Sequence, residues 1–201
     1  GTAAQVLKMN TAANAPEWGN LSSDYVKLST YTVSGTPSSF DWDISFDDSV
    51  YNSYYIVGQL KMSTGGQARF RVRQAGTTKT DSNYDMLFVY AYRTVGGSGN
   101  ASYGGNSGRD YGYFIDWTGT TDCAEFIDLA FSYPSETDTY KPIRINGNKD
   151  RQDGGTAYIF GNHTGTCTYR GNKSAITGLH FYPSAGTFIT PSVLTCYGLK
   201  K

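Results

Sequence analysis

The chain has 201 residues, a formal net charge of zero, 17% charged residues and 38% hydrophobic residues. This length suits one sizeable hydrophobic core, and the balanced charge argues against long-range electrostatic attraction to nucleic acid or to an anionic membrane. We therefore expect no nucleic-acid binding. No apolar run approaches the ~20 residues of a membrane-spanning helix, so we expect no membrane insertion either.

The first 22 residues have the pattern of a strand, a polar turn and a second strand. Val6 and Leu7 lie in a short β-prone run, the turn follows at residues 10–14, and Trp18 is the one large aromatic residue of the segment. A hairpin of this size is only marginally stable alone in water, so Trp18 is expected to pack against a neighbouring subunit or against the body that follows. We therefore expect an N-terminal docking segment, residues 1–22, and one main domain, residues 23–201.

The rest of the chain alternates with a period of two between breaks rich in Gly, Ser, Asn, Asp and Pro. Apolar residues alternate with acidic ones over 40–46 and with arginines over 68–74, as in half-buried antiparallel strands. So many short strands predict an all-β fold, an antiparallel two-sheet β-sandwich or jelly roll, with a closed barrel as the alternative. The other predicted strands are 24–33, 54–62, 86–93, 110–117, 125–133, 141–145, 156–161, 165–170, 174–183, 187–190 and 192–200.

Two segments interrupt this alternation. Residues 96–112, which are rich in glycine and poor in apolar side chains, are predicted to form a long loop, and residues 146–155 a polar turn at the tip of a hairpin. The first segment is the candidate ligand site, because aromatic rings stack on sugars while Asn, Asp and Arg bind hydroxyl groups. The alternative is a loop that only neighbouring subunits order. The candidate residues are Asn100, Tyr103, Asn106, Arg109, Asp110 and Tyr111.

Two rows of charge lie on the predicted strands, acidic residues between 41 and 47 and arginines between 69 and 73. We expect these rows to face each other, across one sheet or between subunits, and to set register and partner choice. The acidic spacing also falls within the range of catalytic carboxylate pairs, but any strand with alternating aspartates produces it, so a solvated face is the expectation. The candidate residues for docking to subunits or to other proteins are Val6, Leu7, Trp18, Arg69, Arg71 and Arg73.

Cysteine and histidine usage provides little material for chemistry. Cys123, Cys167 and Cys196 are odd in number and lack CxxC spacing, so no disulfide framework is expected and Cys196 is interpreted as a small buried hydrophobe. The two histidines, His163 and His180, are too few for a zinc site of the usual kind. Without a phosphate-binding loop or a nucleophile elbow, we expect no enzyme activity, no metal and no cofactor.

Both ends of the chain resemble a known family. The opening around Trp18, the strand over 24–33, the segment YNSYYIVGQLKM and the tract from Lys173 to Lys200 are similar to the terminal domain of virion surface proteins of tailed bacteriophages, especially marine ones. This resemblance implies a lectin-like β-sandwich, often trimeric, but supplies no catalytic residue and no ligand. The residues that carry it at the C-terminal end are Ile176, Gly178, Leu179, Phe181, Gly186, Phe188, Ile189, Leu194, Tyr197, Gly198 and Leu199.

The resemblance leads us to expect a phage virion structural protein. Its role would be that of a distal tail-fibre module on the virion surface, which attaches noncovalently to host-surface glycan. The expected partners are further copies in a homotrimer, other virion structural proteins and the glycan, and several weak sites acting together would give tight attachment. One alternative is a capsid decoration or head-fibre protein bound to the capsid lattice, and another is a tailspike glycan hydrolase.

Overall fold

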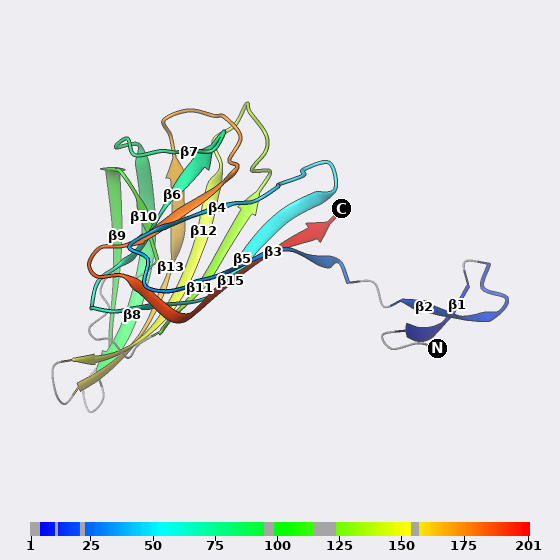
Figure 1. Ribbon diagram of the computed structural model, residues 1–201, viewed down its shortest axis with the longest axis horizontal. Coiled ribbons are helices and arrows are strands. Elements are labelled where there is room, and N and C mark those ends of the chain that lie inside the picture. Colours follow the sequence, from blue (N-terminus) through cyan, green and yellow to red (C-terminus); the bar gives the residue numbers. More distant parts are fainter. Residues whose placement is uncertain (1–4, 11, 21–22, 95–98, 115–123, 154–156) are drawn as a thin grey trace.

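A computed structural model describes residues 5–10, 12–20, 23–94, 99–114, 124–153 and 157–201 of the chain. In these residues the fold is all-β, and neighbouring strands pair antiparallel. Two sheets pack against each other as a β-sandwich, and a separate hairpin precedes them (Figure 1). The all-β sandwich predicted from the alternation of the sequence is therefore confirmed.

The larger sheet forms one layer of the sandwich. Among the described residues its strand order is β3-β15-β5-β11-β12-β13-β8-β9, so β3 and β9 are the edge strands. The β8–β9 hairpin therefore lies along one side of the molecule. The strands are β3 (Tyr25–Thr32), β5 (Tyr51–Met62), β8 (Tyr84–Thr94), β9 (Gly99–Arg109), β11 (Ala124–Ser132), β12 (Pro142–Asp153), β13 (Ala157–Tyr169) and β15 (Phe188–Lys200).

The smaller sheet forms the second layer. Its described strands follow the order β10-β6-β14-β4, and β7 pairs with the end of β6. Because β10 is an edge strand and contacts β8, this edge lies beside the β8–β9 hairpin of the larger sheet. The strands are β4 (Phe40–Asp43), β6 (Ala68–Gln74), β7 (Thr77–Thr78), β10 (Gly112–Tyr113) and β14 (Gly178–Pro183).

The core lies between the two sheets and is rich in aromatic rings. The ring of Phe181 lies 5.1 Å from that of Phe40 and 6.1 Å from that of Phe114, both in stacked arrangements. The hydroxyl of Tyr84 in β8 accepts a hydrogen bond of 2.9 Å from the Val72 N–H in β6, which joins the layers directly. Full burial of such side chains stabilises by about 1.5–3 kcal/mol each. The largest fully buried side chains are Tyr54, Tyr84, Phe70, Phe114, Phe131, Phe181, Phe188, Ile56, Leu60, Ile127, Leu129 and Ile143.

The N-terminal hairpin consists of β1 (Gln5–Met9) and β2 (Pro16–Asn20), as the sequence predicts. Trp18 lies opposite Leu7, and Met9 is two residues from Leu7 along β1, so these three residues share one face. Trp18 remains 56% exposed, and the described body of the chain does not cover it. The other face carries the ion pair of Lys8 with Glu17 at 3.8 Å.

The prediction of a glycine-rich loop over residues 96–112 is wrong for most of this segment. Residues Gly99–Arg109 form β9, which pairs with β8 from Gly99 opposite Arg93 to Arg109 opposite Tyr84. An edge strand is held by backbone hydrogen bonds to one neighbour, and these do not require apolar side chains. A segment poor in apolar residues can therefore form an edge strand, as it does here.

Other boundaries also differ from the predictions. The predicted strands 156–161 and 165–170 belong to the single strand β13, and 187–190 and 192–200 belong to β15, which carries an irregularity between Ile189 and Val193. Most of the predicted turn at 146–155 lies in β12, because a long hairpin continues its backbone pairing where the side chains are polar. Of the predicted strand 110–117, the described residues show only β10, and β4 ends at Asp43 although Ile44 stays buried.

Candidate functional site

An open groove of about 350 Å³ lies between the β8–β9 hairpin and the β10 edge of the smaller sheet. It exists because the positions of β9 that face the interior carry small residues. Ser102 lies opposite Tyr90 and Gly104 opposite Phe88, so two large rings face residues too small to cover them. The lining residues are Gln67, Phe88, Tyr90, Ser102, Tyr103, Gly104, Gly105, Asn106, Arg109, Tyr111 and Tyr113.

Gly104 is required by the close approach of a ring. A Cβ atom at this position would lie 2.8 Å from the Phe88 ring, closer than side chains tolerate. A Cβ atom at Gly105 would instead lie 3.8 Å from the side chain of Leu87, on the opposite face of the strand. The glycine at 104 thus allows the Phe88 ring to lie against the backbone of β9 beneath the groove.

Tyr113 forms a fixed wall of the groove. Its hydroxyl accepts a hydrogen bond of 3.1 Å from Asn106 Nδ2, and its ring lies nearly parallel to that of His163 at 5.7 Å. The ring of Phe88 meets it edge-on at 5.6 Å. Since Tyr113 is only 3% exposed, it holds Asn106 in place and leaves little of its own surface to a ligand.

Tyr111 is the more accessible aromatic residue of the same wall. Its side chain is half-buried, and the guanidinium of Arg69 lies 4.0 Å from its ring centre, a cation–π arrangement. Arg69 is held in turn by two hydrogen bonds to Gln67 Oε1, of 2.9 and 2.8 Å. The groove therefore has one aromatic ring with a cation over one of its faces.

A β-bulge directs Arg109 toward the groove. Residues three apart on a regular strand face opposite sides, yet Asn106 lies opposite Met86 and Arg109 opposite Tyr84, because β9 has one extra residue here. Gly108 has φ +65°, a conformation that suits glycine. The bulge thus brings Arg109 to the side of Asn106, where its Nη2 donates a hydrogen bond of 3.4 Å to Asn106 Oδ1.

Asp110 is tied to the smaller sheet. Arg71 Nε donates a hydrogen bond of 2.8 Å to the carbonyl oxygen of Asp110, and Arg71 Nη2 forms an ion pair with its carboxylate. Arg71 also lies over the ring of Tyr182 at 4.6 Å. Both interactions fix the turn between β9 and β10, and with it the positions of Arg109 and Tyr111 on either side.

The structure brings together only part of the predicted ligand site. Asn106, Arg109 and Tyr111 converge on the groove, and Asp110 is held by Arg71. Tyr103 lies in β9, which borders the groove, but it pairs with the outward-facing Val89 and is 86% exposed. Its side chain therefore faces away from the groove. Asn100 lies in β9, and its side chain is outside the described part of the chain.

Sequence reasoning missed the contribution of β8. The alternation over 86–93 indicates that Phe88 and Tyr90 share a face, which is the signal that could have found them. It does not reveal that this face lies opposite Ser102 and Gly104. That pairing depends on the neighbouring strand, which the sequence had indicated as a loop.

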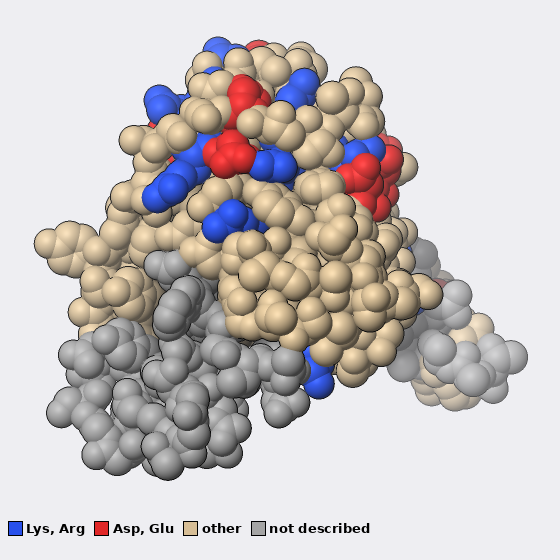
Figure 2. Space-filling model, turned by 60° about the vertical axis from the view of Figure 1, so that its left-hand side comes forward, with Lys and Arg blue, Asp and Glu red and all other residues tan. Residues whose placement is uncertain are grey.

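The expected contact between acidic and basic rows occurs across one sheet at Arg73. Its Nε lies 2.8 Å from Asp43 Oδ1, and its Nη1 pairs with Asp41, which also accepts a 2.6 Å contact from His180 Nδ1. Arg73 is 7% exposed, so its charge is met within the chain. Figure 2 shows that acidic and basic side chains are intermixed over the upper part of the face that it draws.

Asp47, the third acidic residue of the row, takes no part in this pairing. The side-chain and backbone groups of Ser49 donate hydrogen bonds to its carboxylate and thereby lower its pKa. Asp41 and Asp43 share Arg73, and Asp47 is bound by a neighbouring turn. The acidic row is therefore engaged in contacts that hold the fold.

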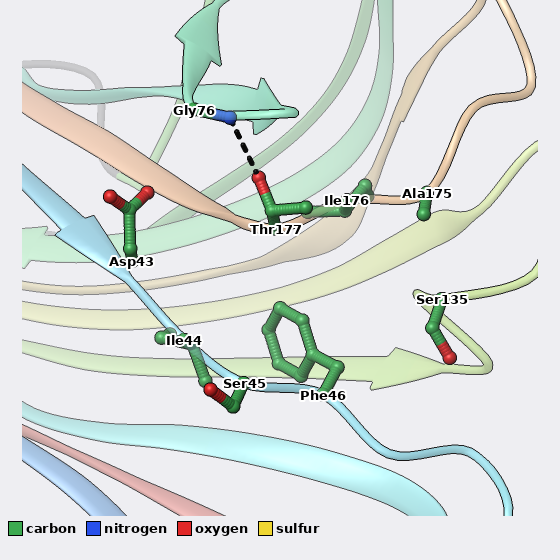
Figure 3. A pocket seen from close by; sticks show the side chains of 9 residues that line it. All are labelled: Asp43, Ile44, Ser45, Phe46, Gly76, Ser135, Ala175, Ile176 and Thr177. Carbon is green, nitrogen blue, oxygen red and sulfur yellow. Dashed lines mark hydrogen bonds between the residues drawn. The ribbon is translucent and has the colours of Figure 1, made fainter.

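A second cavity, of about 470 Å³, lies beyond the opposite end of β6 (Figure 3). The ring of Phe46 and the side chains of Ile44 and Thr177 border it, and Thr177 Oγ1 accepts a hydrogen bond of 3.3 Å from the Gly76 N–H. Among the lining residues that the structure describes, only Asp43 carries a carboxylate, and it is bound to Arg73. Because it gathers none of the predicted ligand residues, the groove beside β9 is the stronger candidate.

The described cysteines and histidines are buried in the fold or contact other residues of it. Cys167 and Cys196 are buried free thiols, and burial raises the pKa of Cys196 to about 12 and that of Cys167 in the same direction. His163 is buried and its Nδ1 contacts the Phe114 carbonyl oxygen. The described residues hold no group of three His, Cys, Asp or Glu placed to bind a metal ion, whereas Cys123 lies outside them.

The described residues include no helix with the length and apolar character of a membrane span. The chain matches no protein-family model, no curated protein and no solved structure.

Proposed function

We propose that this chain is a noncovalent glycan-binding module and that the groove beside β9 holds the sugar. The observation that carries this proposal is the convergence of the half-buried ring of Tyr111 with the amide of Asn106 and the guanidinium of Arg109. An aromatic ring packs against the apolar face of a sugar, while amide and guanidinium groups bond to its hydroxyls. Such a site combines apolar surface with a few convergent polar groups, as small-molecule sites do.

The charge of the lining favours binding without hydrolysis. The described lining residues include no Asp or Glu, and the carboxylate of Asp110, which lies between the lining residues Arg109 and Tyr111 in the chain, is paired with Arg71. Most glycoside hydrolases need two carboxyl groups about 5 to 9.5 Å apart across the scissile bond. The two neighbouring carboxylates of Asp41 and Asp43, on β4, are bound to Arg73. The proposed role is therefore attachment.

The resemblance at the two ends of the chain supports a more specific proposal, a distal tail-fibre module at the surface of a phage virion. The N-terminal hairpin supports docking, because Leu7, Met9 and Trp18 form an apolar face that the described body leaves exposed. We propose that neighbouring copies in a homotrimer cover this face, since a lone hairpin is marginal in water. Several copies binding together would raise the attachment strength about 10²–10⁴-fold.

A role on the capsid lattice would use the same hairpin face with a different partner. Antibody–gold labelling of intact particles separates the two locations. Label at the tail tip supports the tail-fibre module, and label over the head supports capsid decoration.

The binding site itself is tested by a glycan array probed with the full chain and with two tyrosine variants. Tyr111→Ala removes the stacking ring and is expected to weaken binding at least tenfold. Tyr140→Ala is the matched control, because it removes the same type of side chain at an exposed position outside the lining of the groove and should leave binding unchanged. Thermal melting verifies that both variants fold. Full binding by Tyr111→Ala and by Asn106→Ala would refute the site.

A further inference from the structure

We propose that the groove selects sugars that carry a carboxylate, of the uronic-acid class, and that Arg109 binds this carboxylate. The inference rests on the proposed glycan-binding function and names its ligand. The arginines around the groove differ in whether an acidic side chain pairs with them.

Arg109 has no acidic partner among the residues that the structure describes. Its one hydrogen bond there is the long contact of 3.4 Å with the neutral side chain of Asn106. The neighbouring carboxylates are already bound, Asp110 by Arg71 and Asp85 by Arg170 Nε at 2.6 Å. The positive charge of Arg109 is therefore not neutralised by the nearby part of the fold.

A second guanidinium adds to this local charge. Arg69 lies over Tyr111, a lining residue, and both of its hydrogen bonds go to the neutral Gln67 side chain. By contrast, Arg71 and Arg73 on the same strand form ion pairs with aspartates. The chain thus pairs its arginines along β6 except at the end that borders the groove.

The chemistry of guanidinium favours a carboxylate ligand. Its planar fork can donate two parallel hydrogen bonds to the two oxygens of a carboxylate, and charge-assisted bonds are about twice as strong as neutral ones. The bulge at Gly108 turns Arg109 to the side where Asn106 and the ring of Tyr111 would contact the rest of the sugar. Because the whole chain has zero net charge, the preference would arise from the groove and not from a general attraction to anions.

The test compares uronate oligosaccharides with their methyl esters, which keep the ring and remove the charge. The probes are oligomers of glucuronate, galacturonate and mannuronate, measured by calorimetry against the full chain. At least one acid should bind tenfold or more tightly than its ester, and added salt should weaken binding of the acid alone. Arg109→Gln should abolish this preference, so that binding of that acid falls tenfold or more while binding of the ester, which loses only hydrogen bonds to neutral groups, falls less.

The control variant Lys27→Gln makes the same change in net charge on the exposed face of β3, the other edge strand, and should behave as wild type. Equal binding of acid and ester by the wild-type chain would overturn the inference, as would an equal loss of both in Arg109→Gln. If neutral sugars bind and Tyr111→Ala abolishes that binding, the glycan site stands although the acid preference falls. If no glycan binds, both fall.

Discussion

Arg71 holds Asp110 at two points, by a 2.8 Å hydrogen bond to its carbonyl oxygen and by an ion pair with its carboxylate. This contact joins the outer face of the smaller sheet to the turn that carries Arg109 and Tyr111. The shape of the groove therefore depends on a residue that does not line it.

Removal of this contact should weaken both stability and binding. We expect Arg71→Ala to lower the free energy of unfolding by about 1–2 kcal/mol, because charge-assisted hydrogen bonds at a partly exposed site are lost. Glycan affinity should fall although Arg71 touches no ligand. Urea unfolding and calorimetry measure the two effects. Asp110→Asn, which keeps the bond to the carbonyl oxygen, should cost less than Arg71→Ala, and a reversed order would contradict this role.

Two neighbouring glycines should respond differently to the same substitution. In Gly104→Ala the new Cβ atom must displace the Phe88 ring, so we expect a loss of about 1–3 kcal/mol in stability and weaker glycan binding. In Gly105→Ala the Cβ atom points to the outer face, 3.3 Å from the Met86 carbonyl oxygen, and the change should stay within about 0.5 kcal/mol. Similar losses in both variants would show that the face assignment of β9 is wrong.

The hydrogen bond from Tyr169 to Asp81 should make stability depend on pH. Burial alone would raise the pKa of Asp81. The hydrogen bond from Asn83 Nδ2 and the Tyr169 hydroxyl, which lies 2.8 Å from Asp81 Oδ1 and 3.0 Å from Oδ2, outweigh burial and lower the pKa. A carboxyl group with a lowered pKa stabilises the fold above its unfolded-state pKa of about 3.9, and this contribution is lost as pH falls through the folded-state pKa.

Tyr169→Phe should therefore destabilise the chain by about 1 kcal/mol at pH 7, and the difference from wild type should shrink below about pH 4. Urea unfolding at pH 7, 5 and 3 measures this trend. Tyr140→Phe, at an exposed position, serves as the control. A difference that is the same at pH 7 and pH 3 would exclude the charge of Asp81 as its source.

The two described cysteines should be unreactive in the folded protein. Burial raises the pKa of Cys196 to about 12 and also raises that of Cys167, so neither forms the nucleophilic thiolate at pH 8. In a Cys123→Ser background, a disulfide reagent such as DTNB should detect no thiol until denaturant is added, and two thereafter. Rapid reaction of either thiol without denaturant would contradict their burial.

The apolar face of the hairpin should control assembly. Trp18→Ser and Leu7→Ser remove exposed apolar surface and are expected to lower the oligomeric state measured by size-exclusion chromatography with light scattering. Lys8→Ser on the opposite face removes only a surface ion pair, worth at most about 1 kcal/mol, and should leave assembly unchanged. A monomeric wild-type chain, or the same loss from all three variants, would count against docking by this face.

Some features of this protein follow from local alternation alone. Phe70 and Val72 lie inside and the flanking arginines lie on the other face, because successive residues of a strand face opposite sides. The same rule explains why Phe40 and Trp42 are buried while Asp41 and Asp43 are not. The sequence by itself therefore determined the fold class and much of the core.

Only the tertiary structure decided which strands are neighbours, and the groove depends on that choice. Gly99–Arg109 became a strand because β8 pairs with its backbone, an interaction that leaves no mark in side-chain polarity. That pairing placed Tyr103 outside, and the bulge at Gly108 placed Arg109 beside Asn106. The contact of Arg71 with Asp110, 39 residues further along the chain, likewise depends on the arrangement of distant segments. Side-chain period specifies a face, whereas the partner across a strand depends on contacts between distant segments.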